Sequence, residues 1–437
     1  MVIETVLGGA GGLLWTLAAF VVALSIIVAV HEYGHYIVGR LTGIGAEVFS
    51  VGMGPVIWSR TDRRGTRWQV AALPVGGYVK FKGDANAASV GKAEGPVPAG
   101  IAGESIHEAP LWARAATVAA GPAFNFAMAI LVFAGMALWE GRIAEPPTVG
   151  EMRAGGDLLP GDVLLAVEGH PVETLADLRG VDLPTDRALL WTVERRGAVR
   201  EVPGPHPFPP VVTAVSPLSA AAETDIRAGD LIVSMDGASV QTFDELRVLV
   251  GASGGAPVAL GVVRDGEAFE AVLTPRRTDI PLPGGGFETR WLAGIVGGLA
   301  FEPATVRIGP LEALGAGATG VWTLIGTSLD GLWSIVTGAI SSCNLSGPIG
   351  IAEASGAMAE EGARDFVYFL AMLSVAVGLV NLFPVPILDG GHLVFHLYEA
   401  VRGRPPSDAA LRVLMAGGLA AILALMVFAV TNDIFCP

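Results

Sequence analysis

The sequence predicts a polytopic α-helical membrane protein with about four transmembrane helices and β-rich repeats inserted between them. Only 16% of its 437 residues are charged and 52% are hydrophobic, whereas ordinary soluble domains have about 25% charged residues. Four apolar stretches approach or exceed the roughly 20 residues that a helix needs to cross a bilayer. The polar region between the second and third stretches contains a repeated motif, which is typical of small inserted domains.

The four apolar stretches are expected to be the membrane-spanning helices. They lie in residues 1–40, 113–140, 364–400 and 410–432. The first stretch lacks the basic start and the clear cleavage site of a signal peptide, so we interpret it as a permanent span. Residues 308–345 are also apolar but contain Glu312 and Asp330. We expect amphipathic, membrane-associated helices there, and a span over 311–340 is the alternative.

The distribution of basic residues predicts how the chain is oriented in the membrane. The loop in residues 41–112 has many basic residues near its start, namely Arg60, Arg63, Arg64, Arg67, Lys80 and Lys82. Arg402 and Arg404 follow the third span. Since loops rich in arginine and lysine stay in the cytoplasm, both termini and the repeat region are expected outside it. The net charge of −15 argues against a nucleic-acid partner, because such a partner requires a basic surface.

The polar region contains two copies of one motif, in residues 146–206 and 207–277. The Gly-Asp pair that ends in Asp162 recurs 68 residues later, where it ends in Asp230. Each copy continues with a strand, an acidic residue followed by glycine, a second strand and a short helix. Thr174 and Thr242 precede these helices and are suitable N-caps. The Glu-Gly and Asp-Gly pairs favour tight turns.

The two copies resemble PDZ domains of the circularly permuted bacterial type. That resemblance implies binding of extended peptides by strand addition. The first copy departs from the pattern, because 14 steps lead from Thr148 to Asp162 whereas 19 lead from Val211 to Asp230. Peptide binding by the first copy is therefore left open, and two β-rich spacers without ligands are the alternative.

A His-Glu-x-x-His motif at the end of the first span indicates a zinc site. His31 and His35 are four residues apart, so in a helix they share one face and can bind the same ion. Glu32 is rotated by about 100° from His31, which places its carboxylate beside the metal. A carboxylate there can accept a proton from water and later pass it to a leaving amine. Two interfacial histidines without a metal are the alternative, although polar residues in a span are costly unless they bind something.

A catalytic zinc ion requires a third protein ligand and one open position. Asp389 is the preferred candidate, because it follows an apolar run that is broken by Pro384 and Pro386. We expect it on irregular backbone at membrane depth, which is tolerated only against protein or a water-filled cavity. His392 and His396 are the competing ligands.

The two cysteines, Cys343 and Cys436, are too few for a disulfide framework and lack zinc-finger spacing. Both are interpreted as unrelated buried thiols, with one disulfide between them as the alternative.

The sequence resembles the site-2 protease family of intramembrane metalloproteases over nearly its whole length. The matching motifs are His31 to His35, Gly121 to Asn125 and Asn381 to Gly390, one in each of the first three spans. The PDZ-like repeats lie between the second and third of them. The resemblance implies one zinc ion per chain on His31, His35 and Asp389, with Glu32 as the acid–base catalyst.

Two further segments resemble the re-entrant membrane β-hairpin of this family, namely Phe49 to Gly54 and Ala72 to Lys80. The resemblance implies that Gly76 and Gly77 of the hairpin bind the substrate or order the site, together with Asn125 and Asn381. An exposed strand edge would hold a stretch of the substrate extended beside the zinc ion. We expect that edge near residues 70–72.

The resemblance also implies a substrate and a location. The substrate is expected to be a single-span membrane protein already trimmed outside the cytoplasm, such as an anti-sigma factor. The active site is expected towards the cytoplasm of a bacterial inner membrane, with the PDZ-like pair in the periplasm as a filter against bulky domains. Two other functions are the alternatives, a membrane-anchored PDZ scaffold and a metal transporter. A scaffold needs no His-Glu-x-x-His motif, and a transporter places polar ligands along several helices.

Overall fold

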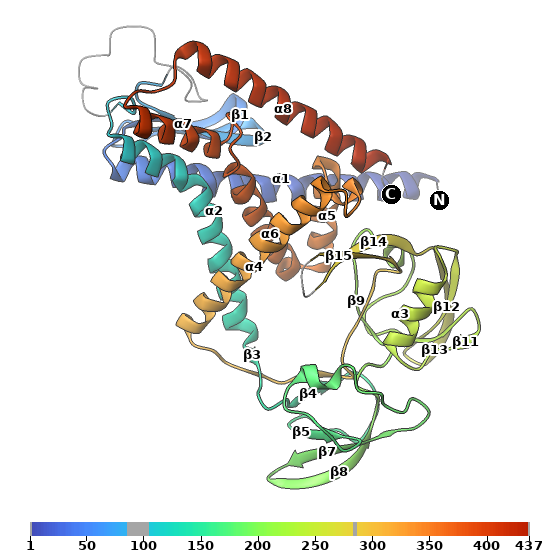
Figure 1. Ribbon diagram of the computed structural model, residues 1–437. Helices are drawn as coiled ribbons and strands as arrows, with labels where there is room; N and C mark the ends of the chain where they lie inside the picture. Colours follow the sequence, from blue (N-terminus) through green and yellow to red (C-terminus); the bar gives the residue numbers. More distant parts are fainter. Residues whose placement is uncertain (1, 85–104, 283–285, 436–437) are drawn as a thin grey trace. The chain divides into compact units, whose positions relative to one another are not determined.

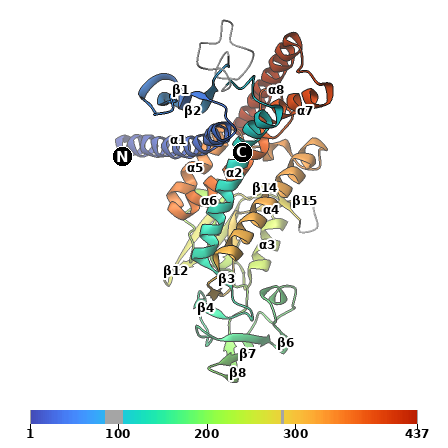
Figure 2. The ribbon, with the colours of Figure 1, turned by 90° about the vertical axis from the view of Figure 1, so that its left-hand side faces the viewer.

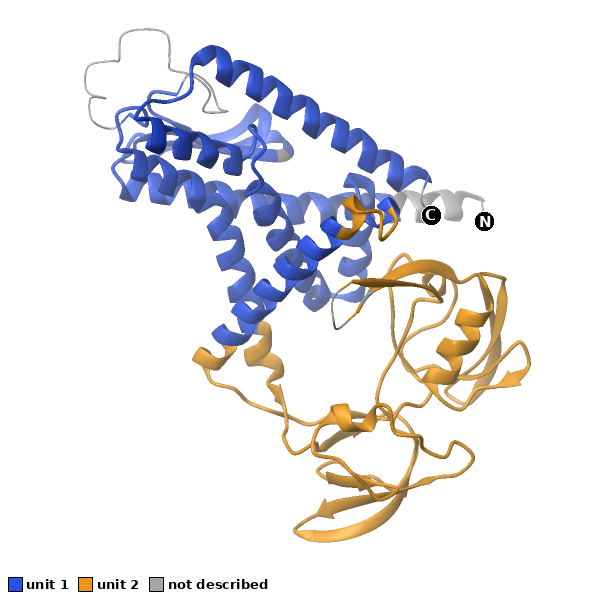
Figure 3. Cartoon of the chain, in the orientation of Figure 1, with its two compact units in different colours: residues 1–135, 314–333, 342–437 blue, residues 136–313, 334–341 orange. Residues whose placement is uncertain are grey.

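The computed structural model describes residues 2–84, 105–282 and 286–435. The chain divides into two compact units, which Figure 3 shows in different colours. Unit 1 comprises residues 1–135, 314–333 and 342–437, and unit 2 comprises residues 136–313 and 334–341.

Among the described residues, four helices are long and apolar enough to cross a membrane, which agrees with the number of spans that the sequence predicts. They are labelled in Figure 1, and from another side in Figure 2, as α1 (Val2–Leu41), α2 (Leu111–Glu140), α6 (Ala363–Asn381) and α8 (Asp408–Phe435). Within unit 1, α2 packs on α6 through Ala129, Ala371 and Val375, and Val321 of α4 (Pro310–Val336) joins the same cluster. The bundle therefore brings the second and third spans together.

The apolar region after residue 308 forms one helix, α4, and this helix is not among the four candidate spans. Its tryptophans are largely exposed, Trp322 to 76% and Trp333 to 68%. After a short 3-10 turn, η3 (Ser342–Asn344), the chain forms α5 (Pro348–Glu361), which packs on α1. Asp433 lies near the end of α8, and its carboxylate accepts hydrogen bonds from backbone N–H groups at the start of α5. The shortest of these bonds, from Gly347, is 2.7 Å long. These bonds satisfy donors that a helix start leaves without partners.

The third span ends earlier than its apolar sequence suggests. Helix α6 ends at Asn381, and a separate helix, α7 (Asp389–Arg402), follows a turn that contains both prolines. Asp389 is therefore the first residue of a helix, and the expectation of irregular backbone at that position is wrong. The first turn of a helix favours an acidic side chain, because its free N–H groups and its dipole are positive there.

Cys343 in η3 is disulfide-bonded, so its interpretation as a free buried thiol is wrong. The other cysteine, Cys436, lies outside the described residues. Asn432 of α8 donates to the carbonyl oxygen of Ser342 at 2.7 Å. This hydrogen bond holds the end of α8 beside η3.

The hairpin of β1 (Ala46–Thr61) and β2 (Arg67–Phe81) folds back on itself into four paired segments. Residues 46–51 pair with residues 77–81 on one side. On the other side, residues 48–51 pair with residues 67–70. Residues 67–71 pair in turn with residues 56–61. The segments 77–81 and 56–61 are therefore the two edges. Val70 is paired on both sides, with Val51 and Trp58, so it does not lie on the edge that the sequence predicts near residues 70–72.

Unit 2 contains two four-stranded sheets of the same design. The strands of the first, in sheet order, are β6 (His170–Pro171), β5 (Val163–Val167), β7 (Leu189–Arg195) and β8 (Ala198–Gly204). Those of the second are β11 (Ala238–Ser239), β10 (Leu231–Met235), β12 (Val258–Arg264) and β13 (Glu267–Leu273). The first repeat has a four-residue 3-10 turn, η1 (Leu175–Leu178), where the second has the helix α3 (Phe243–Ala252). Thr174 and Thr242 form capping boxes there, as the sequence predicts.

Several short pairs complete unit 2 with strands from beyond residue 277. The pairs are β9 (Val212–Val215) with β16 (Ile295–Gly297), β4 (Val149–Met152) with β17 (Phe301–Pro303), β3 (Arg142–Ile143) with β18 (Thr305–Val306), and β14 (Arg276–Pro281) with β15 (Phe287–Leu292). A 3-10 turn, η2 (Ala221–Glu223), follows β9. Because β17 returns to β4, the second repeat is inserted within the first, and the first repeat receives a strand that its own segment lacks.

The repeated aspartates have a structural role in unit 2. Asp162 and Asp230 are almost fully buried, and each forms two hydrogen bonds with an arginine of the third strand along the chain, Arg195 or Arg264. Desolvation raises the pKa of Asp230, but the bonds from Arg264 outweigh it and hold the pKa below its usual value. The Gly-Asp repeat thus marks a buried ion pair in each sheet.

Candidate metal centre

Helix α1 supplies two histidines from its buried face. Ala23 and Ile27 are fully buried, His31 is 8% exposed, and His35 continues the same line in steps of four residues. Steps of four keep side chains on one side of a helix. The apolar residues that pack this face against the bundle therefore also direct both imidazoles inward.

Asp389 reaches the histidines from the start of α7. Its neighbours Gly390 and Gly391 are buried, and a Cβ on Gly390 would overlap the carbonyl oxygens of Leu382 and Phe383. Only glycine lets the first turn of α7 pack this closely on the preceding turn. The Asp-Gly-Gly sequence thus folds the chain back so that the carboxylate points at α1.

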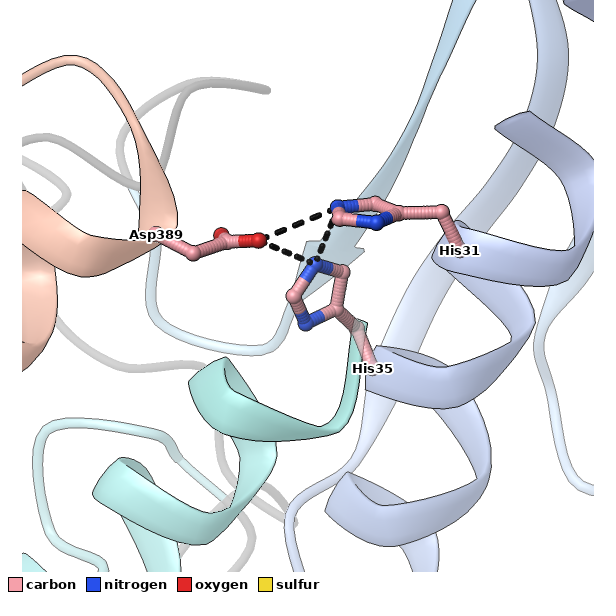
Figure 4. Close-up of side chains that lie close together, drawn as sticks. All are labelled: His31, His35 and Asp389. Atoms are coloured by element: carbon pink, nitrogen blue, oxygen red, sulfur yellow. Dashed lines mark hydrogen bonds and ion pairs between the residues drawn. The ribbon is translucent and has the colours of Figure 1, made fainter. Parts of the chain in front are cut away.

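The three side chains meet at one point, as Figure 4 shows. The Nε2 atom of His31 lies 3.0 Å from Oδ2 of Asp389 and 3.1 Å from Nε2 of His35. The Nε2 atom of His35 lies 3.4 Å from the same Asp389 oxygen. Among the described residues, these three form a group whose potential ligand atoms all lie within 4.8 Å of one another. His392 and His396, the competing candidates, are not part of this group.

Hydrogen bonds outside the group set the tautomers of both histidines. Nδ1 of His35 donates to the carbonyl oxygen of Thr117 at 2.8 Å, which leaves Nε2 of the neutral ring with a lone pair. The amide of Asn125 lies 3.2 Å from Nδ1 of His31, and its Oδ1 is buried without a hydrogen-bond partner among the described residues. Rotating that amide by 180° lets Oδ1 accept from Nδ1 of His31 and satisfies both atoms.

With these tautomers the donor set fits a zinc ion. Two nitrogen lone pairs and the buried Oδ2 of Asp389, which has no hydrogen-bond partner among the described residues, face one another. Such a contact is repulsive unless a cation lies between the atoms. Bonds of about 2.0–2.1 Å in a tetrahedral site separate ligand atoms by about 3.3 Å, close to the three distances observed. Carbonyl and amide partners on the outer ring nitrogens are typical of zinc-bound histidines.

Two glycines make the space for this arrangement. A Cβ on Gly121 of α2 would overlap the ring of His35 and lie 2.8 Å from Cε1 of His31. A Cβ on Gly77 of β2 would lie 2.8 Å from Val28 and 3.2 Å from Cγ of Glu32. Gly121 therefore admits the imidazoles, and Gly77 lets the sheet edge approach the predicted acid–base residue. The Gly121–Asn125 motif thus contributes both space and a hydrogen bond.

A cavity of about 610 Å³ opens from this group within unit 1. Glu32, Gly77 and Asn381 line it beside the three candidate ligands, and His392 and His396 line it farther along α7. The backbone of Val79 forms a hydrogen bond with the Glu32 carboxylate. Gly76 instead has a positive φ of 81° and approaches Met53, so its position indicates a role in bending the strand.

An ion pair that sequence reasoning missed connects α7 to α2. Arg114 donates to both carboxylate oxygens of Glu399, at 3.0 and 2.7 Å, and both side chains are less than one-fifth exposed. This hydrogen bonding holds the pKa of Glu399 below its usual value. A lone arginine near a helix start gives no signal of such a partner 285 residues away. The pair fixes the helix that carries Asp389 to the helix that carries Gly121 and Asn125.

The sequence pattern of peptidase family M50 matches residues 19–425. The chain belongs to peptidase family M50. A protein of Rhizobium meliloti that is named as a zinc metalloprotease is 38% identical over 426 residues, covering 96% of each chain. One from Agrobacterium fabrum is 36% identical over 437 residues, with 99% of this chain and 98% of the relative covered. The regulator of sigma-E protease RseP of Salmonella typhimurium is 33% identical over 457 residues, with 96% and 98% covered.

Membership in the M50 family confirms the resemblance to site-2 proteases and the enzyme class. The protein is a zinc metalloprotease of the membrane, and zinc is its cofactor. Neither a PDZ scaffold without catalysis nor a metal transporter is favoured. The geometry described above agrees with the family, because its potential ligand group consists of a His-x-x-x-His pair and one carboxylate.

The space at Gly121 yields a first prediction. The variant Gly121→Ala should lose zinc affinity by about tenfold or more, since its methyl group displaces the imidazoles. The measurement is the zinc retained by the purified protein against a competing chelator. Gly135→Ala on the same helix is the control, because a Cβ there meets nothing within 4 Å. Both changes raise helix propensity alike, so equal zinc retention by the two variants would contradict this account.

The ion pair between α2 and α7 yields a second prediction. Glu399→Gln and Arg114→Gln should each lower the cleavage rate, and the exchanged pair Arg114→Glu with Glu399→Arg should recover part of it. The pKa of Glu399 is lower in the folded protein than in the unfolded chain. The ion pair therefore stabilises the folded protein at pH values above the unfolded-state pKa of about 4.3. This stabilisation is lost as the pH falls through the folded-state pKa. At low pH, the thermal stability of the wild type should therefore become similar to that of the Glu399→Gln variant. A constant difference in stability at all pH values would argue against the pair.

Proposed function

We propose that this M50 protease hydrolyses a peptide bond in or near the transmembrane segment of a single-span membrane protein. The observation that carries the proposal is the position of the candidate zinc ligands. The two histidines lie near the end of α1, a candidate membrane-spanning helix, and together with Asp389 they line a cavity that the outer segment 77–81 of the hairpin sheet also lines. A relative is named as a regulator of sigma-E protease. By analogy, a trimmed anti-sigma factor is the proposed substrate class, in regulated intramembrane proteolysis.

His31, His35 and Asp389 would hold the zinc ion, and Glu32 would be the acid–base residue. When bound, zinc acts as a Lewis acid that polarises the scissile carbonyl and makes water a better nucleophile. Glu32 accepts a proton from the attacking water and donates it to the leaving amine. The bond from Val79 holds the carboxylate in place. Asn125 keeps the ring of His31 oriented, and Asn381 contacts the substrate in the cavity.

The substrate would bind by strand addition at the edge formed by residues 77–81. Gly77, Tyr78, Val79 and Phe81 line the cavity that contains Glu32. A substrate helix must unwind before its carbonyl groups are accessible, and pairing with a strand edge stabilises the extended form. The hairpin would be re-entrant, because its exposed apolar side chains, such as Met53, suit a lipid environment.

The active site would face the cytoplasm, with unit 2 outside it. Basic residues of the hairpin support this orientation by the positive-inside rule. The disulfide of Cys343 also supports it, since disulfides persist in oxidising compartments, and Cys343 lies at the end of α8 that is remote from Arg404. The two sheets of unit 2 would act as PDZ-like domains that exclude substrates with bulky external parts.

Replacement of the acid–base residue tests the proposed reaction. The variant Glu32→Gln should abolish cleavage of a model single-span substrate and retain about one zinc ion per chain. His35→Ala should lose both cleavage and zinc. The assay compares cleavage and metal content of the purified proteins in detergent. Cleavage by Glu32→Gln at the wild-type rate would contradict the assigned role.

Cross-linking tests the proposed edge. In the inactive Glu32→Gln background, Tyr78→Cys should form a disulfide with a single-cysteine substrate near its scissile bond. Ile57→Cys is the matched control, because residues 56–61 form the opposite edge of the same sheet. Cross-linking at Ile57→Cys but not at Tyr78→Cys would assign substrate binding to that edge instead.

A further inference from the structure

The second edge of the hairpin sheet ends in a cluster of arginines. Arg60, Arg63, Arg64 and Arg67 surround the turn between β1 and β2, and all four are exposed. We call these four residues and the turn residues 61–66 the basic turn. Ile57 and Trp58, which precede it on the edge strand, are 71% and 54% exposed. Guanidinium groups and large apolar side chains thus occupy neighbouring positions on one exposed edge.

The one acidic residue of the basic turn is engaged by the protein itself. The carboxylate of Asp62 accepts hydrogen bonds from the backbone N–H groups of Arg64 and Thr66, at 2.8 and 3.0 Å, and from Nε1 of Trp68 at 3.1 Å. Desolvation raises the pKa of Asp62, but these bonds outweigh it and keep the pKa below its usual value. Asp62 therefore shapes the turn, and the arginines keep a net positive charge towards solvent.

Contacts with α1 place the basic turn near the end of the first span. Tyr36 donates to Asp62 at 3.4 Å, and its ring lies 5.0 Å from that of Trp68. Tyr36 is one helical turn, about 6 Å, beyond Glu32 towards Arg40. The apolar pairs Met53 with Leu73 and Val56 with Ala71 lie farther from the turn. The arginines thus lie beside the last turns of α1, where a span is expected to leave the hydrocarbon region.

A hollow of about 380 Å³ lies beside this turn. It is lined by Trp58, Arg60, Thr61, Asp62, Arg63 and Trp68. Two guanidinium groups and a hydroxyl can donate to phosphate oxygens, and arginine does so with two parallel hydrogen bonds. Indole rings suit the boundary between head groups and acyl chains.

We propose that this hollow binds the head group of an anionic phospholipid in the adjacent leaflet. The phosphate contacts Arg60 and Arg63, and the acyl chains lie along Ile57 and Trp58. The exposed apolar side chains next to the arginines favour a lipid over a soluble acidic ligand, since a soluble ligand would leave them in water. Basic residues near a membrane surface attract anionic lipids. Bound lipid would hold the edge strand to α1 through Trp68 and Tyr36.

Lipid retention by the purified full-length protein tests the proposal. The protein is reconstituted with phosphatidylcholine that contains limiting phosphatidylglycerol, and native mass spectrometry then counts the bound phosphatidylglycerol. The double variant Arg60→Gln with Arg63→Gln should retain about thirtyfold less than the wild type, with unchanged zinc content. The matched control is Arg196→Gln with Arg200→Gln, which removes the same charge from exposed positions of unit 2.

Three results would overturn the proposal. The first is equal retention by the double variant and the wild type, and the second is an equal loss in the control. The third is displacement of the lipid by excess inorganic phosphate or by a soluble acidic peptide, which would assign the hollow to a small anion or a protein partner. Selective loss in the double variant without such displacement would support the lipid site.

Discussion

The convergence of three lone-pair donors inside a membrane protein is the constraint on which the rest of this structure depends. The Nε2 atoms of His31 and His35 and one oxygen of Asp389 lie 3.0–3.4 Å apart with little water access. Without a cation between them, these atoms repel one another, and polar groups at membrane depth are costly. Metal binding removes the repulsion. Because the three donors do not hold one another together without the metal, the residues around them have to keep them in a geometry that fits zinc.

The surrounding structure meets that requirement with space, hydrogen bonds and one ion pair. Gly121 leaves room for the rings, and the carbonyl oxygen of Thr117 fixes the tautomer of His35. Arg114 and Glu399 hold α7 against α2, which fixes the direction from which Asp389 approaches. These contacts connect segments that are far apart in the sequence, so the site exists only when the bundle is assembled.

Local patterns predicted the parts of the site that depend on local geometry. The spacing of His31 and His35 predicts one helix face, and the proline-broken apolar run predicts a polar residue placed beside them. Partners that depend on tertiary contacts gave no such signal. Glu399 as the partner of Arg114 and Thr117 as the acceptor of His35 could not be read from spacing. The same holds for the sheet order, in which residues 67–70 are interior, and for the strand that returns from residue 301 to the first repeat.

The most direct test of the shared zinc site is X-ray absorption spectroscopy at the zinc edge of the purified full-length protein. The account predicts light-atom ligands only, at about 2.0–2.1 Å, with scattering from two imidazole rings and a carboxylate in place of sulfur. The variant Asp389→Asn should change this spectrum and lower the zinc content. A spectrum with sulfur ligands, or one that Asp389→Asn leaves unchanged, would contradict the assignment of His31, His35 and Asp389.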